Sequence, residues 1–214
     1  RSTWSSQPLI RNISGENYII NDTGCFGFGL YYKDNSRQGL EWYGCGRSGV
    51  GRGAPFEMMP EIDFFEPINI TVIYNRGRMN VELEQDGSFY EFENILSSHY
   101  TYDIDPHYIG FAASTDTLEN GRLKQEISNI SGWFHQPSSS GPSEEQADFA
   151  LATNNWEVFL KASWTNENSA LNLVAETSGT TGRAICKTPI ALSQPFTLSY
   201  KITQKGLASK YTYS

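Results

Sequence analysis

The sequence predicts an all-β fold built from two packed antiparallel sheets. Its 214 residues include 14% aromatic residues and 19 glycines, a composition that favours strands and turns over helices. Short β-branched and aromatic segments alternate with turn signals along most of the chain. No segment shows a clean helical period, because the best candidate, residues 154–164, spaces its apolar residues irregularly. The length suits one large all-β domain with a single core.

The strands follow one another in a regular series. They are predicted at Leu9–Ile13, Tyr18–Ile20, Phe26–Tyr32, Phe56–Phe65, Ile68–Tyr74, Arg78–Gln85, Tyr90–Phe92, Tyr108–Ala113, Leu123–Phe134, Leu171–Ala175, Arg183–Cys186 and Phe196–Thr203. Asn75-Arg76-Gly77 and Asp86-Gly87 have the chemistry of hairpin turns, because Gly supplies a positive φ. Residues 68–90 are therefore predicted to form an antiparallel meander.

A core follows from the apolar positions of these strands. Apolar and polar residues alternate over residues 68–72, which places Ile68, Ile70 and Val72 on one face of the predicted strand. The predicted core consists of Phe28, Leu30, Ile62, Phe64, Ile70, Val72, Val81, Leu83, Ile109, Phe111, Ile127, Leu171, Leu173, Ile185, Phe196 and Leu198.

A stretch of linker composition divides the chain. Residues 136–146 combine two prolines with a serine cluster and carry no large apolar side chain. The predicted organisation is a first part over residues 1–136, a Pro/Ser linker over 137–146, and a second part over 147–214. The two parts are predicted to complete one sandwich.

Both parts carry a family resemblance. The run from Tyr108 to Thr115, Tyr-Ile-Gly-Phe-Ala-Ala-Ser-Thr, followed by Ile127–Phe134, resembles the closing segment of L-type (legume-type, concanavalin A-like) lectin domains. Ile68–Leu83 resembles the preceding hairpin of that family, and Gly44–Phe65 resembles its Gly-rich loop and Glu-Phe-Asp strand. Ala170–Thr203 resembles the opening of the same domain. The resemblance implies a two-sheet antiparallel jelly-roll sandwich.

The order of these segments is the reverse of the family's, since the closing part comes first. One solution is a circular permutant, in which the linker joins the old termini and the chain folds on itself. The other is a half-domain exchange, in which each part completes a sandwich with a neighbouring molecule. Such a heterologous exchange closes into a ring or continues as a fibre. The sequence leaves both solutions open.

The resemblance also implies where a sugar site would lie. Lectins of this family bind sugar beside calcium, which requires six to eight oxygen ligands. Glu61 and Asp63 match the family's ligand-bearing strand, but the chain continues directly into the next strand without the ligand-bearing loop. Phe26-Gly27 stands where the family has its sugar-binding Asp-Gly. Calcium is therefore not expected, and a glycan surface would use Trp42 and Tyr43, whose alternative role is packing within the sandwich.

The same acidic residues permit an enzymatic interpretation. Glu61, Asp63 and Glu66 match the Glu-x-Asp-x-x-Glu signature of laminarinase- and lichenase-type glucanases, in which the first Glu is the nucleophile and the last the acid/base. In a regular strand Glu66 would point away from the other two, so a bulge would be needed. The segments that should line a glucan cleft are absent after the motif. The chain is therefore not expected to be an enzyme.

Charge and modification motifs indicate an exported protein. The formal net charge of −8 disfavours nucleic-acid partners, and no apolar run approaches the roughly 20 residues of a membrane span. Cys25 and Cys45 are candidates for a disulfide, and Cys186 would then be without a disulfide partner in the chain. N-glycosylation sequons occur at Asn12, Asn21, Asn69 and Asn129.

These observations lead us to expect an extracellular, non-catalytic glycoprotein that uses a lectin-like sandwich as a structural, self-assembling and fibre-forming module. The alternative is a carbohydrate-binding L-type lectin. A third interpretation is a retaining β-glucanase using Glu61, Asp63 and Glu66. The expected partners are neighbouring subunits, glycans or both.

Overall fold

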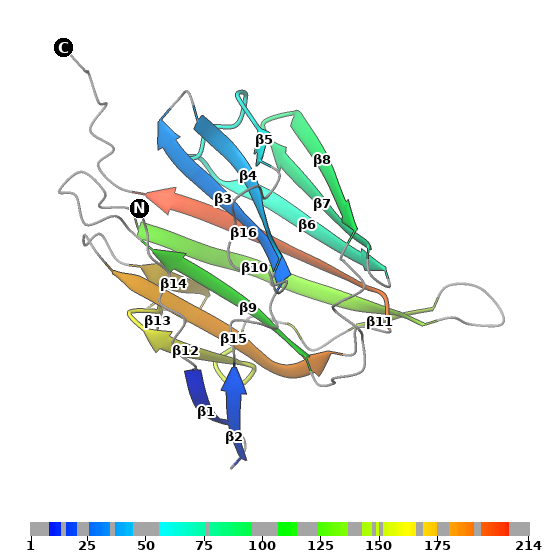
Figure 1. Ribbon diagram of the computed structural model, residues 1–214, viewed down its shortest axis with the longest axis vertical. Coiled ribbons are helices and arrows are strands. Elements are labelled where there is room, and N and C mark those ends of the chain that lie inside the picture. The colour runs from blue at the N-terminus through cyan, green and yellow to red at the C-terminus, as the bar shows by residue number, and fades with distance from the viewer. Residues whose placement is uncertain are drawn as a thin grey trace. The chain divides into compact units, whose positions relative to one another are not determined.

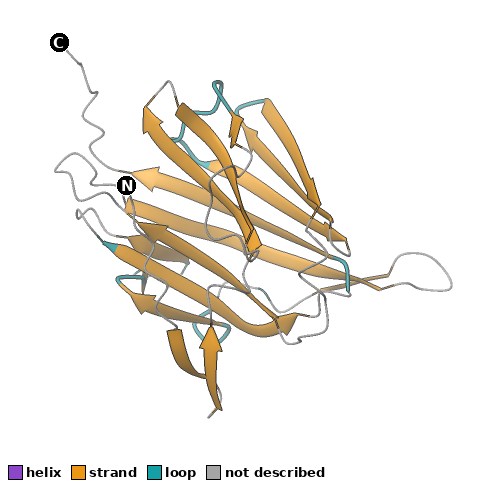
Figure 2. Ribbon diagram, in the orientation of Figure 1, coloured by secondary structure: helices purple, strands orange, loops and turns teal. Residues whose placement is uncertain are grey.

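The computed structural model contains only strands, turns and loops in the part of the chain that it describes (Figure 2). The described residues are 9–13, 16–20, 26–34, 37–44, 56–75, 78–95, 107–114, 124–136, 143–146, 149, 152–165, 169–174, 180–190 and 194–205. All strand pairs are antiparallel within this part of the chain. The predicted all-β class is therefore confirmed.

The chain forms two compact units, the first of which comprises residues 1–61 and 96–101. Its strands are β1 (Leu9–Ile13), β2 (Glu16–Ile20), β3 (Phe26–Asp34), β4 (Arg37–Gly44) and β5 (Phe56–Met58). β1 pairs with β2, and a three-stranded sheet has the order β3-β4-β5. Leu40 on β4 and Met59, directly after β5, are fully buried.

The second unit comprises residues 62–95 and 102–214 and contains an eight-stranded sheet (Figure 1). The strands of this sheet are β6 (Ile68–Asn75), β7 (Arg78–Gln85), β8 (Ser88–Ile95), β10 (Lys124–Gln136), β11 (Ser143–Gln146), β13 (Ser163–Trp164), β14 (Ala170–Val174) and β16 (Phe196–Lys205). Their order is β13-β14-β10-β16-β6-β7-β8, and β11 pairs with the end of β10. The neighbours β6, β7 and β8 form the predicted meander.

A three-stranded sheet completes the second unit, with the order β12-β15-β9. Its strands are β9 (His107–Ser114), β12 (Trp156–Leu160) and β15 (Thr181–Ile190). Phe111 on β9 stacks on Trp156 at a centroid distance of 5.3 Å and meets Tyr200 of the larger sheet edge-to-face at 4.8 Å. The contact between Phe111 and Tyr200 joins the faces of the two sheets, as expected for a sandwich.

The buried face of the larger sheet follows from strict alternation. On β6, Ile68, Ile70, Val72 and Tyr74 are buried, and on β7 the buried positions are Met79, Val81, Leu83 and Gln85. Phe149 closes one end of this core, because its ring lies edge-to-face against Phe134 and Phe196. Gly132 makes room for that ring, since a Cβ there would lie 2.1 Å from it.

Most of the predicted core is buried, with an informative exception on β15. The residues confirmed as buried are Ile62, Phe64, Ile70, Val72, Val81, Leu83, Ile127, Leu171, Leu173, Phe196 and Leu198. On β15 the alternating residues Gly182, Ala184 and Cys186 face the core, so Ile185, which lies between two of them, is only half-buried. The remaining predicted core residues are also half-buried, namely Phe28, Leu30, Ile109 and Phe111.

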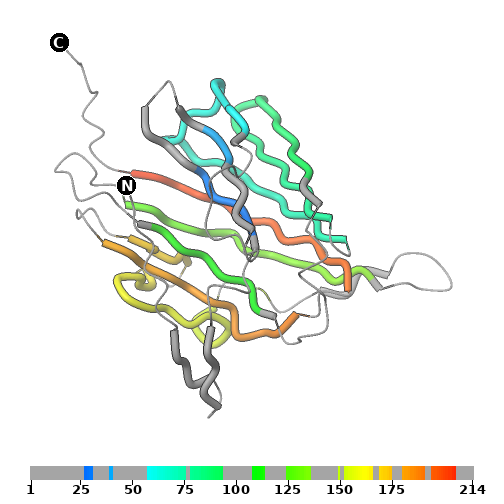
Figure 3. Tube along the Cα trace, viewed as in Figure 1, coloured from blue at the N-terminus to red at the C-terminus, as the bar shows by residue number. Residues whose placement is uncertain are grey.

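Both sheets combine strands from before and after the predicted linker (Figure 3). β16 lies between β10 and β6, pairing Leu198 with Gly132 on one side and with Val72 on the other. In the smaller sheet, β15 lies between β12 and β9. β11 falls inside the predicted linker, and its Ser143 pairs with Gln136. The end of that segment is therefore strand, whereas residues 137–142 lie outside the described part. The partition into two parts stays a prediction.

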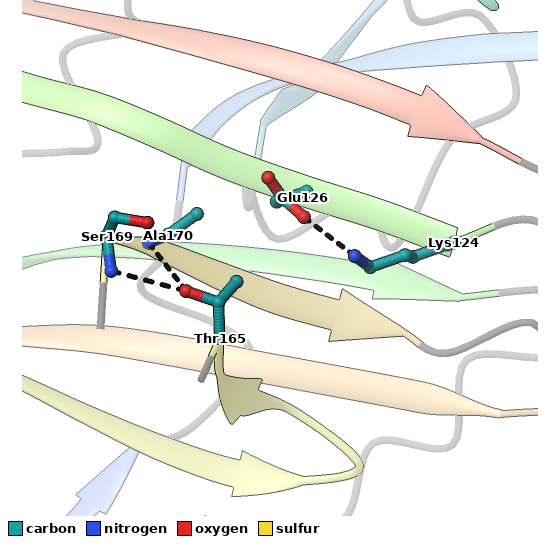
Figure 4. A network of polar contacts seen from close by, with 5 residues as sticks. All are labelled: Lys124, Glu126, Thr165, Ser169 and Ala170. Atoms are coloured by element: carbon teal, nitrogen blue, oxygen red, sulfur yellow. Dashed lines mark hydrogen bonds and ion pairs between the residues drawn. The ribbon is translucent and has the colours of Figure 1, made fainter. Parts of the chain in front are cut away.

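Local side-chain chemistry sets the tight turns. Asp86 and Gly87 have positive φ values of 48° and 86°, as their hairpin composition predicts. Between β13 and β14, the Thr165 hydroxyl accepts hydrogen bonds from the backbone N–H groups of Ser169 and Ala170, both at 3.2 Å (Figure 4). On β10, Lys124 and Glu126 form an ion pair at 2.8 Å.

Candidate functional site

The acidic motif Glu61, Asp63 and Glu66 lies in a run of turns and not on a strand. Sequence analysis predicted a strand over Phe56–Phe65, but the strand ends at Met58 and residues 59–67 contain only turns and irregular backbone. All three carboxylate residues are exposed, whereas Ile62 and Phe64 between them are buried. The strand prediction is wrong because these two apolar side chains enter the core from a turn, which the alternating pattern alone does not distinguish from a strand.

Gln85, at the end of β7, holds this turn in place. The Asp63 N–H donates to Gln85 Oε1 at 2.6 Å, and Gln85 Nε2 donates to the Asp63 carbonyl at 2.7 Å. The same Nε2 is 3.3 Å from the Glu66 carbonyl and 3.4 Å from the Pro67 carbonyl. The Gln85 side chain is only 6% exposed, so these bonds satisfy a buried amide.

The Asp63 carboxylate also serves the turn itself. Its Oδ1 accepts the Phe65 N–H at 2.9 Å, and the Glu66 N–H donates to the Asp63 carbonyl at 3.1 Å. Asp and Asn commonly stabilise turns through this bond to the backbone two residues on. The local chemistry of Asp63 is thus that of a turn-forming residue.

Gln85 engages backbone oxygens of the turn that a calcium site would commonly use. Calcium takes six to eight oxygens, commonly backbone carbonyls as well as carboxylates. Here the carbonyl oxygens of Asp63, Glu66 and Pro67 accept hydrogen bonds from the Gln85 amide. Among the described residues, no group of three or more His, Cys, Asp and Glu side chains could hold a metal ion.

The glycan-surface and disulfide predictions fall largely on residues outside the described part. Trp42 and Tyr43 lie on β4, opposite Phe28 and Gly27, but their side chains are not among those described. Cys25 and Cys45 also lie outside it. Cys186 is buried on β15, opposite Trp156 on β12. The pairing of Cys25 with Cys45 therefore stays a prediction.

Two of the four sequon asparagines are exposed on the eight-stranded sheet. Asn69 lies within β6, between Lys201 of β16 and Glu84 of β7. Asn129 lies on β10, where the register with β16 shifts between Ser128 and Ser131, and it has a positive φ of 53°. Both side chains are exposed. Asn12 lies on β1, and Asn21 lies outside the described residues.

The side chains opposite the buried face form what we call the polar face of the eight-stranded sheet. In its centre Thr71 and Ser199 hydrogen-bond at 3.1 Å, and His135 Nε2 lies 2.7 Å from the Thr197 hydroxyl. Its β7–β8 end is acidic. There Asn80 donates to Glu91 at 2.7 Å and Arg78 donates to Glu93 at 2.9 Å.

Sequence reasoning missed two features that organise the second unit. The first is Gln85. The alternation on β7 places it on the buried side of the strand, and a polar residue at such a position could have indicated a buried hydrogen-bonding role. Phe149 is the other, because it lies outside the strands and is fully buried. No strand was predicted over residues 147–152, so sequence reasoning had no element in which to place Phe149.

Comparison with known proteins adds no further assignment. No protein-family model matches the chain, and no curated protein matches it significantly. Among the described segments there is no helix with the length and hydropathy needed to cross a membrane.

Proposed function

We propose that this chain is an extracellular, non-catalytic glycoprotein whose lectin-like sandwich is a structural module that assembles with further copies of itself. The observation that carries the proposal is the position of β16 between two strands of the first part of the chain. β16 pairs with β10 over residues 124–134 and with β6 over residues 68–74, so residues 196–205 are inserted between strands from before the linker.

This arrangement gives the second part of the chain the properties of an exchangeable segment. Phe196, Leu198 and Tyr200 are buried, and two of them contact aromatic rings of the first part: Phe196 stacks on Tyr74 at 5.1 Å, and Tyr200 meets Phe111 at 4.8 Å. The same contacts would form if the segment came from a neighbouring copy, because an exchanged element keeps its native partners. The connection through residues 137–142 would then decide between closure within one chain and exchange between chains.

The acidic turn supports a non-catalytic role. A retaining glycosidase needs two carboxyl groups that face one another about 5–5.5 Å apart across a substrate. The contacts seen in this motif are those of a turn: Asp63 Oδ1 accepts the Phe65 N–H, and Gln85 binds the N–H and the carbonyl of Asp63. They support a structural role for Asp63, the middle residue of the motif.

The test is the native mass of the secreted, purified full chain, by light scattering with negative-stain imaging of the same sample. Rings or filaments are expected, and their amount should rise with protein concentration. A compact monomer at all concentrations would contradict the assembly proposal.

Two assays on the same sample address the other functions. Release of reducing sugar from β-glucans, abolished by Glu66→Gln, would show an enzyme and overturn the non-catalytic part of the proposal. Calcium-dependent retention on a glycan array would favour the carbohydrate-binding lectin instead.

A further inference from the structure

We infer that Asn129 carries an N-linked glycan that projects from the polar face of the eight-stranded sheet. The inference rests on the proposed extracellular function and deepens it, because it favours Asn129 over Asn69, the other sequon asparagine whose side chain is described. The first observation is the backbone of Asn129. Its φ of 53° is in the left-handed region, which Asn tolerates better than most residues other than Gly.

The left-handed residue belongs to a β-bulge. The register between β10 and β16 runs through Ser128 paired with Lys201 and resumes at Ser131 paired with Ser199. Two residues of β10, Asn129 and Ile130, thus lie opposite the single residue Tyr200. A bulge leaves the extra residue outside the ladder and redirects its side chain.

The other edge of β10 is also open at this point. β14 pairs with β10 only as far as Ser128, and β11 begins to pair at Trp133. Within the described part of the chain, Asn129 to Gly132 therefore have no strand partner on that side. Sequons that carry glycans occur on surface loops, and this interruption makes the backbone of Asn129 loop-like inside a long strand.

The polar face can accommodate an attached sugar without disturbing the core. Asn129 is exposed, whereas the flanking Ile127 and Ile130 are 2% and 6% exposed and point into the core. Ser131, the hydroxyl residue of the sequon, lies opposite Ser199 and so shares the polar face with Thr71. A glycan on Asn129 would extend into solvent from this face.

Asn69 is a natural comparison within the same sheet. Its sequon also has Ile in the middle position, and its side chain is exposed. Its backbone, however, lies in register with β16 on one side and β7 on the other. Once the sheet has formed, Asn69 cannot adopt a turned conformation without breaking both ladders, so the structure favours Asn129 as the acceptor.

The reaction is a group transfer from a lipid-pyrophosphate-linked oligosaccharide by the oligosaccharyltransferase of the secretory pathway. The Nδ2 of Asn129 forms a bond to the anomeric carbon of the first sugar and loses a proton. The bond from that carbon to the pyrophosphate oxygen breaks, and the lipid pyrophosphate leaves. No oxidation or reduction takes place.

The test is secretion of the full chain from a eukaryotic cell culture, followed by enzymatic deglycosylation in heavy-oxygen water and peptide mass spectrometry of all four sequons. The isotope label marks each asparagine that carried a glycan. We expect Asn129 to be labelled more completely than Asn69. Ser131→Ala should remove one glycan, seen as one step in gel mobility, whereas the matched Thr71→Ala variant should change the mobility less.

A second variant separates the loss of the acceptor from the loss of the fold. Asn129→Gly suits the positive φ and removes the acceptor nitrogen, so it should lose the glycan and keep the circular dichroism spectrum and melting transition. Glycans at other sequons with Asn129 unmodified, or Asn69 modified as fully as Asn129, would overturn this inference alone. A secreted chain without any glycan would overturn the glycoprotein proposal as well.

Discussion

Gln85 is a polar residue in a core position, and its side chain links two parts of the second unit that are far apart in the chain. It continues the buried side of β7 after Met79, Val81 and Leu83. The amide uses its oxygen and its nitrogen at once, on the backbone of Asp63. A buried amide is tolerated when its donors and acceptors are bonded, and it is costly when they are not.

Replacement of Gln85 by Leu should lower the free energy of unfolding by about 2–4 kcal/mol, because the Asp63 N–H would lose its acceptor and the turn its main hydrogen bonds. Urea denaturation followed by tryptophan fluorescence measures this change. The matched control is Glu84→Ala, an exposed neighbour on the same strand, which should change stability by less than about 0.5 kcal/mol. An unchanged urea midpoint for Gln85→Leu would show that the turn is held by other contacts.

Tyr200 makes stability depend on pH in the alkaline range. Burial raises the pKa of its phenol above the usual value, because the phenolate cannot be solvated in the core. A group whose pKa is raised on folding contributes stability that is complete below the unfolded pKa, about 10 for Tyr. That contribution is lost as the pH rises from this value toward the folded pKa.

The free energy of unfolding should therefore fall above about pH 10, with a slope from this residue of up to about 1.4 kcal/mol per pH unit. Urea denaturation at a series of alkaline pH values measures it. Tyr200→Phe removes the titrating group, so its stability should fall less steeply over the same range. Parallel pH curves for the two proteins would contradict the assignment to Tyr200.

At the scale of elements, β15 approaches β14 closely at Gly182. A Cβ on Gly182 would lie 1.5 Å from the Leu173 carbonyl oxygen and 2.9 Å from the Ala162 nitrogen, and both of these atoms are backbone. A backbone neighbour cannot move aside as the end of a flexible side chain can. The smaller sheet and β14 can therefore approach at this point only if residue 182 has no side chain.

Gly182→Ala should accordingly lower the free energy of unfolding by at least about 3 kcal/mol, which is the upper end of the range for overpacked cores. The soluble yield and the thermal melting transition measure the effect. Gly110→Ala is the control in the same sheet, because its Cβ would meet Ala184 and Ile185 at 3.3 Å, where a small shift suffices. Equal melting transitions for the two variants would refute the argument from close approach.

At the scale of the whole molecule, the chain is held together by strand pairs that join residues far apart in the sequence. β10 has β16 on one side, and β14 and then β11 on the other. Removing β14 and β16 would leave β10 and β6 with unpaired edges and half of their core exposed. Sheets in that condition are unstable in water.

A protease site inserted within residues 137–142 tests this dependence. After cleavage the two fragments should remain associated and keep the native mass of the uncut chain, whereas each fragment purified in denaturant should fail to refold alone. Size-exclusion chromatography and circular dichroism read out both results, with the uncut chain carrying the same insertion as control. Cooperative melting of either isolated fragment would contradict the prediction that the parts depend on each other.

The sequence by itself determined the all-β class, the meander and most of the buried positions. Alternation and turn chemistry are local, so Ile70, Val72 and the Asp86-Gly87 turn could be recognised within a few residues of their neighbours. The acidic motif was recognised for the same reason, but its conformation was not. Ile62 and Phe64 are buried both in the predicted strand and in the observed turn, so their pattern does not separate the two.

Tertiary structure alone decided which strands far apart in the sequence are neighbours and how the acidic turn is held. Gln85 and Asp63 are separated by 22 positions, and Thr71 and Ser199 by 128, so no local pattern relates them. The buried side of β15 was likewise set by tertiary packing: the side that carries Gly182 faces the Leu173 backbone of β14, so Ala184 on the same side is buried and Ile185 is left half-buried. Local energies favour a strand at many positions, but only the packing of distant residues determines which face of that strand is buried.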